Sequence, residues 1–266
     1  LYMACQNGHA PVVELLLASS GIAINQAKTT TGSTPLYMAC QNGHAPVVEL
    51  LLASSGIDVN QAQTTTGCTP LFQASQNGHA SVVELLLASS GIAVNQAKTT
   101  NGCTPLFHAC QNGHAPVVEL LLAVSNIDVN EPLMNGATPL IIASYLGQAS
   151  CVSLLLKDPT IDLALLFQEH TALQLAQPSM RVVDWKFLEE EIKIEGRQNV
   201  VQLLLDAGAL NSADVVAEGE TKSSKESKKT KKVSVKKQKK FAEALCKAVK
   251  EENLTMIRLL LAKDET

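Results

Sequence analysis

The stretch GSTPLYMACQNGHAPVVELLLASSGIDVNQAQTTT, residues 32–66, sets the architecture, because close copies of it follow one another along the chain. Residues 67–101 differ from it at eight of 35 positions. The same glycine recurs every 34 or 35 residues, at Gly8, Gly43, Gly78, Gly113 and Gly147. A unit this short cannot bury a core alone, so neighbouring units must complete it. Since nearly every residue recurs, the pattern indicates a stacked binding scaffold and not an enzyme.

The composition favours thin helical layers. Hydrophobic residues make up 46% of the 266 residues, but aromatic residues only 3%. Leu, Val, Ile and Ala must therefore fill the interior, which suits helices that approach one another closely. A glutamate interrupts each Val-Val-x-Leu-Leu-Leu run, so no apolar stretch reaches the roughly 18 to 20 residues that a membrane-spanning helix needs. We expect a soluble protein.

One unit is predicted to contain two short helices and a projecting segment. Thr34 caps the first helix and Pro35 occupies its first turn, where the missing N–H costs nothing. Gly43 ends this helix in a left-handed conformation. The second helix begins around Pro46, is apolar on most of its circumference, and is closed by Gly56. The remaining Thr-rich segment, residues 57–66, is predicted to form an extended finger with a turn at its tip.

The positions that recur in residues 32–66 are Thr34, Pro35, Leu36, Ala39, Gly43, His44, Val47, Val48, Leu50, Leu51, Leu52, Gly56, Asp58, Val59 and Asn60. This pattern resembles the ankyrin repeat, over about residues 1–212 and again, more weakly, over residues 241–263. The resemblance implies an all-α ankyrin-repeat solenoid of helix-turn-helix units with projecting β-hairpin-like fingers.

One position departs from that family's pattern. The family usually carries a histidine after Thr-Pro-Leu, where this chain has Tyr37, Phe72, Phe107 and Ile141. By resemblance, that histidine makes a hydrogen bond between repeats. We expect apolar packing to replace the bond here.

The chain divides into three parts. Residues 1–212 are the predicted array, with a partial first unit and an insertion at 177–198 that carries the lone tryptophan, Trp185. The apolar spacing around Trp185 predicts an amphipathic helix, which either packs on its own array or is exposed as an anchor for a partner. Residues 213–240 are predicted to be a disordered linker, and residues 241–266 a partial further repeat. Residue 1 falls inside a motif and the chain stops just after a second-helix motif, so a fragment of a longer protein is expected.

Cysteine and histidine lie four residues apart in three units, but the pairs are not expected to bind metal. The pairs are Cys5/His9, Cys40/His44 and Cys110/His114. A glycine breaks the helix between the two members of each pair, the equivalent residue in the third unit is Ser75, and no further ligand is near in the motif. Buried free thiols of a reducing compartment are the preferred interpretation. We expect no cofactor and no catalysis within this span.

The lysine-rich segment has several interpretations. Ten lysines and one glutamate lie between Lys222 and Lys240, a net charge of +9. The segment is either a solvated tether between two arrays, a nuclear localisation signal, or a contact for nucleic acid or an acidic membrane. It lacks interleaved aromatic residues and arginine, so base recognition is not expected. The protein is predicted to be cytoplasmic, with nuclear import through this segment as the alternative.

The expected role is that of a protein–protein interaction scaffold. In ankyrin arrays the finger tips and the exposed side of the first helices line a concave surface that holds other proteins. By resemblance, the matching positions are Ser33, Met38, Gln41, Asn42, Thr65, Thr66, Cys68, Gln73, Gln76, Asn77, Thr100, Asn101, Cys103, His108, Gln111 and Asn112. The alternative is that the array is the targeting or regulatory portion of a larger enzyme or signalling protein.

The Gln-Asn pair is the same in four successive units, whereas a surface that fits an irregular partner usually varies. Two explanations stay open. The units are recent duplicates without a selected partner, or the partner is itself periodic. In the second case affinity should increase steeply with the number of units.

Overall fold

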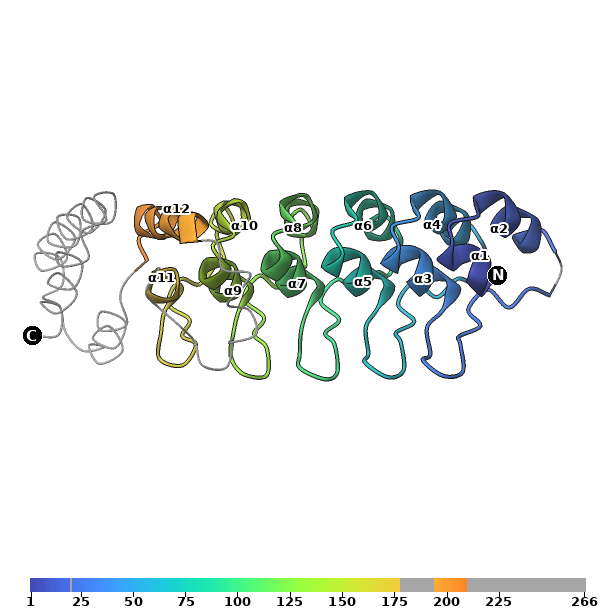
Figure 1. Cartoon of the computed structure of the whole chain (residues 1–266), viewed down its shortest axis with the longest axis horizontal. Helices are drawn as coiled ribbons and strands as arrows, with labels where there is room; N and C mark the ends of the chain where they lie inside the picture. Colours follow the sequence, from blue (N-terminus) through green and yellow to red (C-terminus); the bar gives the residue numbers. More distant parts are fainter. Residues whose placement is uncertain (20, 178–193, 210–266) are drawn as a thin grey trace, which may run out of the picture.

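The structure, a computed structural model, describes residues 1–19, 21–177 and 194–209 as one array of stacked helix pairs (Figure 1). The odd-numbered helices form one row and the even-numbered helices a second row beside it, and the fingers project from the first row. The pairs are α1 (Tyr2–Gln6) with α2 (Ala10–Leu17), α3 (Pro35–Gln41) with α4 (Ala45–Leu52), α5 (Pro70–Gln76) with α6 (Ala80–Leu87), α7 (Pro105–Asn112) with α8 (Ala115–Leu122), α9 (Pro139–Leu146) with α10 (Ala149–Leu155), and α11 (Ala172–Leu175) with α12 (Ile194–Asp206).

Threonine caps start the first helices, as the Thr-Pro pattern predicts. The Thr34 hydroxyl accepts a hydrogen bond from the Tyr37 amide at 3.1 Å, and Pro35 follows at the first helical position. Thr69, Thr104 and Thr138 cap α5, α7 and α9 in the same way. A capped helix of seven or eight residues is too short to be stable alone, so packing between units must hold it.

Glycine ends the first helices for two reasons. Gly43 has φ +74°, a conformation that residues with a Cβ rarely adopt. A Cβ at this position would also lie 2.6 Å from Nδ1 of His79 in the next unit. The second helices differ from the prediction: α4 ends at Leu52, and Gly56 follows only after a turn.

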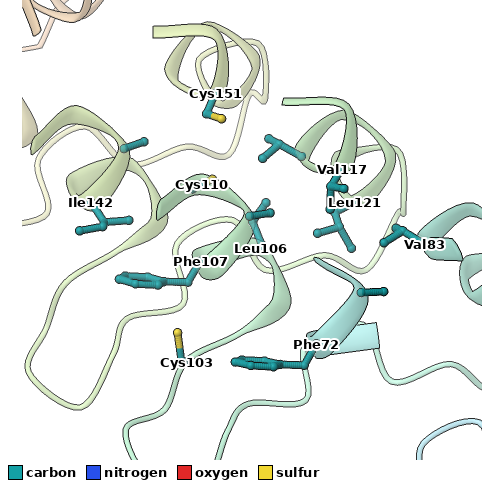
Figure 2. Packing of buried hydrophobic residues seen from close by; sticks show 14 of the residues in the cluster. Phe72, Val83, Cys103, Leu106, Phe107, Cys110, Val117, Leu121, Ile142 and Cys151 are labelled. Carbon is teal, nitrogen blue, oxygen red and sulfur yellow. The ribbon is translucent and has the colours of Figure 1, made fainter. Parts of the chain in front are cut away.

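The core runs through the whole array as repeated layers of small and branched side chains. In each of the inner pairs α3/α4, α5/α6 and α7/α8, the first helix buries a leucine and an alanine, and the second buries two valines and a leucine. Figure 2 shows this packing around Leu106, Phe107, Cys110, Val117, Leu121, Ile142 and Cys151. Full burial of one such aliphatic side chain contributes about 1.5–3 kcal/mol, so stability comes mainly from the contacts between layers.

The last helix pair, α11 and α12, has two features that the sequence analysis did not predict. Helix α12 begins at Ile194, inside the stretch 177–198 predicted to be an insertion. Arg197 is completely buried, donates to the main-chain oxygens of Tyr145 and Gln177, and lies over the Tyr145 ring at 4.3 Å. Gly196 allows this approach, because a Cβ there would collide with the carbonyl oxygen of Gly147.

The fingers are built from turns. The bridge between Phe167 and His170 is the sole β-type pairing in the described ranges, so the array is helical with no sheet. None of the helices in these ranges has the length and apolar character needed to cross a membrane. Trp185, the lysine-rich segment and residues 213–266 lie outside the described residues, so the predictions for them stay predictions.

Candidate functional site

Each finger folds back on itself through a main-chain hydrogen bond near the helix that follows. The amides of Lys28, Gln63 and Lys98 donate to the carbonyl oxygens of Ser33, Cys68 and Cys103 at 2.8–2.9 Å. This turn places the side chains of Ser33, Cys68 and Cys103 against the core, where all three are buried. These three candidates therefore pack in the core at the base of the finger and do not form a surface that a partner could contact.

The finger tips lie side by side and leave threonine and asparagine exposed. Thr65, Thr100 and Asn101 are exposed, and Thr66 is half-buried. The Thr99 hydroxyl and amide both donate to the carbonyl oxygen of Thr66, at 3.0 and 3.1 Å. Bonds of this kind hold one tip against the next, so four of the candidate residues form a continuous polar edge.

A second group of candidates lies at the ends of the first helices. We call it the amide row and define it as Gln41, Asn42, Gln76, Asn77, Gln111 and Asn112; the asparagines are exposed and the glutamines partly exposed.

The amide row is tied to the unit before it. Asn42 Nδ2 donates to the main-chain oxygen of Gln6 at 2.8 Å, and His44 Nε2 donates to the same oxygen at 3.0 Å. Asn77 with His79 and Asn112 with His114 repeat this arrangement one unit on each time. The glutamine carboxamides and the asparagine Oδ1 atoms have no hydrogen bond in the part of the chain that the structure describes, and are available to a partner.

The same hydrogen bonds engage two histidines of the Cys/His pairs, His44 and His114. His44 Nε2 is committed to Gln6, and its Nδ1 faces Gly8 of the preceding unit. No group of three histidine, cysteine or acidic side chains that could hold a metal ion occurs in the described ranges.

Burial makes four of the cysteine thiols poor nucleophiles. The six cysteines in the described ranges are free and buried, as predicted. Burial raises the pKa of Cys5 to about 11 and that of Cys103 to about 12, and it also raises the pKa of Cys40 and Cys110 well above the usual range of a thiol. The thiolate is the reactive form, so these side chains are packing residues.

Met38, Gln73 and His108 occupy equivalent positions on successive first helices. Met38 and Gln73 are buried, and His108 is partly exposed. The Tyr37 hydroxyl donates to Gln73 Oε1 at 2.9 Å, so the expectation of purely apolar packing after Thr-Pro-Leu is wrong in this unit. This bond joins two neighbouring units, as the hydrogen bond of the family's usual histidine does. The equivalent Phe72, Phe107 and Ile141 are buried among apolar residues.

His108 lies edge-on to two aromatic rings. Its ring centroid is 5.1 Å from that of Phe72 and 6.3 Å from that of Phe107, with interplanar angles of 86° and 89°. Burial, with a smaller contribution from Lys98, lowers the pKa of His108 to about 4. The buried Nδ1 has no hydrogen-bond partner among the described residues. His108 is therefore neutral at pH 7 and presents a partly exposed aromatic edge.

Sequence reasoning missed two features of this surface. Asn25, Asn60, Asn95 and Asn130 each bridge to the next unit through both ends of the carboxamide. Because these asparagines occupy the same position in successive units, the sequence could have identified them. The other feature is Met134, which is 74% exposed on the fourth finger, where Leu-Met replaces the Thr-Thr of earlier tips.

A family model described as ankyrin repeats in three copies matches residues 1–98 and 93–166. Among solved structures, the fold is similar to an ankyrin repeat domain from Acinetobacter baumannii AYE, with a TM-score of 0.63 and 25% identity over 79% of this chain and 97% of that one. It is also similar to a second structure described as an ankyrin repeat protein, with a TM-score of 0.62 and 20% identity over 76% of this chain and 94% of that one. No curated protein matches the chain.

Proposed function

Because this chain belongs to the ankyrin-repeat family, we propose that it binds a partner protein across its finger tips and amide row, on the concave side of the array. Ankyrin repeats are generally protein–protein interaction modules, and proteins built from them are typically non-enzymatic scaffolds. The partner is a protein surface and not a small substrate, because the candidate residues are spread along several units instead of converging on one point.

The amide row is the main structural support for this proposed binding function. Three successive units present the same uncharged glutamine and asparagine, and in the described part of the chain the glutamine carboxamides and the asparagine Oδ1 atoms are left without partners, while the asparagine Nδ2 atoms bond to the preceding unit. Each glutamine carboxamide can both donate and accept, and each asparagine Oδ1 can accept, so the row offers modest hydrogen bonds at a regular spacing. Such a surface gains affinity from the number of units engaged.

Two further residues, one on α7 and one on the fourth finger, are the proposed anchors. His108 offers an uncharged aromatic edge, and Met134 offers a flexible apolar side chain. Exposed apolar and aromatic side chains carry much of the binding energy in protein interfaces. The buried candidates Ser33, Met38, Cys68, Gln73 and Cys103 act by holding the fingers and first helices in place.

Affinity capture with the full chain tests this proposal. The test variant carries Gln41→Lys, Gln76→Lys and Gln111→Lys. The control variant carries Glu49→Gln, Glu84→Gln and Glu119→Gln on the exposed side of the second helices, and raises the net charge by the same amount. Proteins that the wild type and the control retain and the test variant loses would be partners of the amide row.

Equal retention by all three baits would contradict the proposal, provided that circular dichroism shows the variants folded. Loss in both variants would show that charge, and not the amide row, determines capture. With a partner identified, affinity measured against arrays of increasing length separates a periodic partner, which gains steeply with each unit, from recent duplicates, which do not.

A further inference from the structure

We propose that Asn101 and Asn135, at the tips of two fingers, are sites of spontaneous deamidation, and that hydrogen bonds between units protect Asn42, Asn77 and Asn112 from the same reaction.

The chain contains six Asn-Gly dipeptides, which begin at Asn7, Asn42, Asn77, Asn101, Asn112 and Asn135. Glycine after asparagine favours deamidation because no Cβ hinders the approach of its main-chain nitrogen to the asparagine side chain. The dipeptide is the same at all six sites, so differences in rate within the folded chain must come from structure.

The reaction needs no reagent except water. The glycine nitrogen attacks Cγ of asparagine, a C–N bond forms, the bond from Cγ to Nδ2 breaks, and ammonia leaves with the proton of the glycine amide. Water then opens the cyclic imide at either carbonyl to give aspartate or isoaspartate. The net change is asparagine plus water to an acid plus ammonia, with no redox step.

At the finger tips, each asparagine side chain bonds to the backbone just beyond its own glycine. Asn101 Oδ1 accepts from the amide of Cys103 at 3.2 Å, and Asn135 Oδ1 accepts from the amide of Ala137 at 3.1 Å. The turn bends each carboxamide toward the backbone that follows it, and the donor polarises the carbonyl that is attacked. Both asparagines are exposed to water, and neither Nδ2 has a hydrogen bond to the described residues.

One interaction opposes attack at the tips. The amide of Gly102 donates to the carbonyl oxygen of Lys98 at 2.9 Å, and that of Gly136 to Leu133 at 2.8 Å. These bonds lie within single exposed turns. Local opening of an exposed turn has a low free-energy cost, although at Asn101 it also breaks the bond from the Met134 amide to the Asn101 carbonyl oxygen.

At the ends of the first helices, by contrast, hydrogen bonds hold the asparagine side chains in a way that hinders the reaction. Nδ2 of Asn42, Asn77 and Asn112 donates to the preceding unit at 2.7–2.8 Å. The bond directs the carboxamide away from its own glycine and retains the leaving nitrogen. Attack therefore requires loss of a contact between units.

The first unit supplies a natural control. Residues 1–22 and 36–57 are identical, but Asn7 has no unit before it in the described chain, and its Nδ2 has no hydrogen bond there. Asn7 and Asn42 thus differ in the bond and not in local sequence. A net hydrogen bond corresponds to about a two- to tenfold change in rate, which is the expected ratio of Asn7 to Asn42.

The test incubates the full chain in mildly alkaline buffer and follows each site by peptide mapping with isoaspartate detection. Cleavage after Glu14, Glu49 and Glu84 places Asn7, Asn42 and Asn77 in separate peptides, and fragment ions separate Asn101 from Asn112. We expect acid to accumulate first at Asn101 and Asn135, roughly five- to tenfold faster than at Asn42, Asn77 and Asn112. A parallel sample in urea should show six similar rates.

The proposal is overturned if the helix-end asparagines react as fast as the finger-tip ones, or if the order of rates in the folded chain matches the order in urea. Asn101→Thr and Asn135→Thr introduce the residue found before Gly32 and Gly67, and should abolish acid formation at each site without changing the rates elsewhere.

Discussion

At the scale of single residues, a histidine between two aromatic rings makes stability depend on pH. The pKa of His108 is lowered to about 4 by burial and, to a lesser degree, by Lys98, whereas an unfolded histidine titrates near 6.5. Between these values the unfolded chain binds more protons, so the free energy of unfolding increases with pH. This contribution is complete above about pH 6.5 and is lost as the pH falls toward 4, and it amounts to at most roughly 3 kcal/mol.

His108→Gln introduces the residue found at the equivalent Gln73 and removes the titrating group. We expect the variant to lose less stability than the wild type between about pH 7 and 4, because no proton has to be excluded at this position. Urea unfolding at a series of pH values measures the difference. An unchanged dependence on pH would show that His108 does not titrate with a lowered pKa.

The buried hydroxyl of Ser75 is expected to lower the stability, compared with the cysteines at the equivalent positions. Cys40 and Cys110 occupy the equivalent positions, and Ser75 Oγ is buried without a hydrogen-bond partner in the described part of the array. Ser75→Cys is therefore expected to raise the free energy of unfolding by about 1–2 kcal/mol, because a thiol loses less than a hydroxyl on leaving water. Cys110→Ser should lower it by a similar amount. Urea unfolding tests both, and equal stabilities would contradict the explanation.

At the scale of structural elements, asparagines at the finger bases join neighbouring units. Asn60 Nδ2 donates to the carbonyl oxygen of Gly91 at 2.8 Å, and Asn60 Oδ1 accepts from the amide of Ala93 at 2.9 Å. Asn60→Ala removes both bonds and is expected to cost about 1–3 kcal/mol in urea unfolding. It should also increase hydrogen exchange at the Ala93 amide.

Gln61→Ala is the matched control for Asn60→Ala, because Gln61 follows directly, is partly exposed, and makes no side-chain hydrogen bond in the described chain. Its effect should stay within about 0.5 kcal/mol. If both variants lose the same stability, the asparagine bridge contributes nothing specific.

The elements were largely predictable from the sequence, and the exposure of the candidate residues was not. The Thr-Pro signal located the helix starts because a cap is a local interaction. Met38 and Cys103 were expected at a surface, yet both are buried, since the neighbouring unit and the folded finger cover them. The hydrogen bond from Tyr37 to Gln73 joins residues 36 positions apart, and no local pattern shows it. The local motif predicts each element, whereas contacts between units determine which side chains stay accessible.

At the scale of the whole molecule, the same stretch of sequence occurs in two different structural environments. Residues 1–22 and 36–57 are identical, and the second copy packs against the first. Met3 is 62% exposed and its equivalent Met38 is 8% exposed, while Val12 is 47% exposed and Val47 is 1% exposed. In a stack of this kind, stability is approximately a sum over units and their nearest-neighbour interfaces.

The pair Val12→Thr and Val47→Thr measures that interface directly. The two changes are chemically the same and lie in the same local sequence, so helix propensity cancels between them. At Val47 the hydroxyl would be buried between α2 and α4, with an expected cost of about 1–3 kcal/mol in urea unfolding. At Val12 the hydroxyl meets water, and the cost should stay within about 0.5 kcal/mol. Equal costs at the two positions would mean that the second unit gains nothing from the first, and the array would then not be stabilised by stacking.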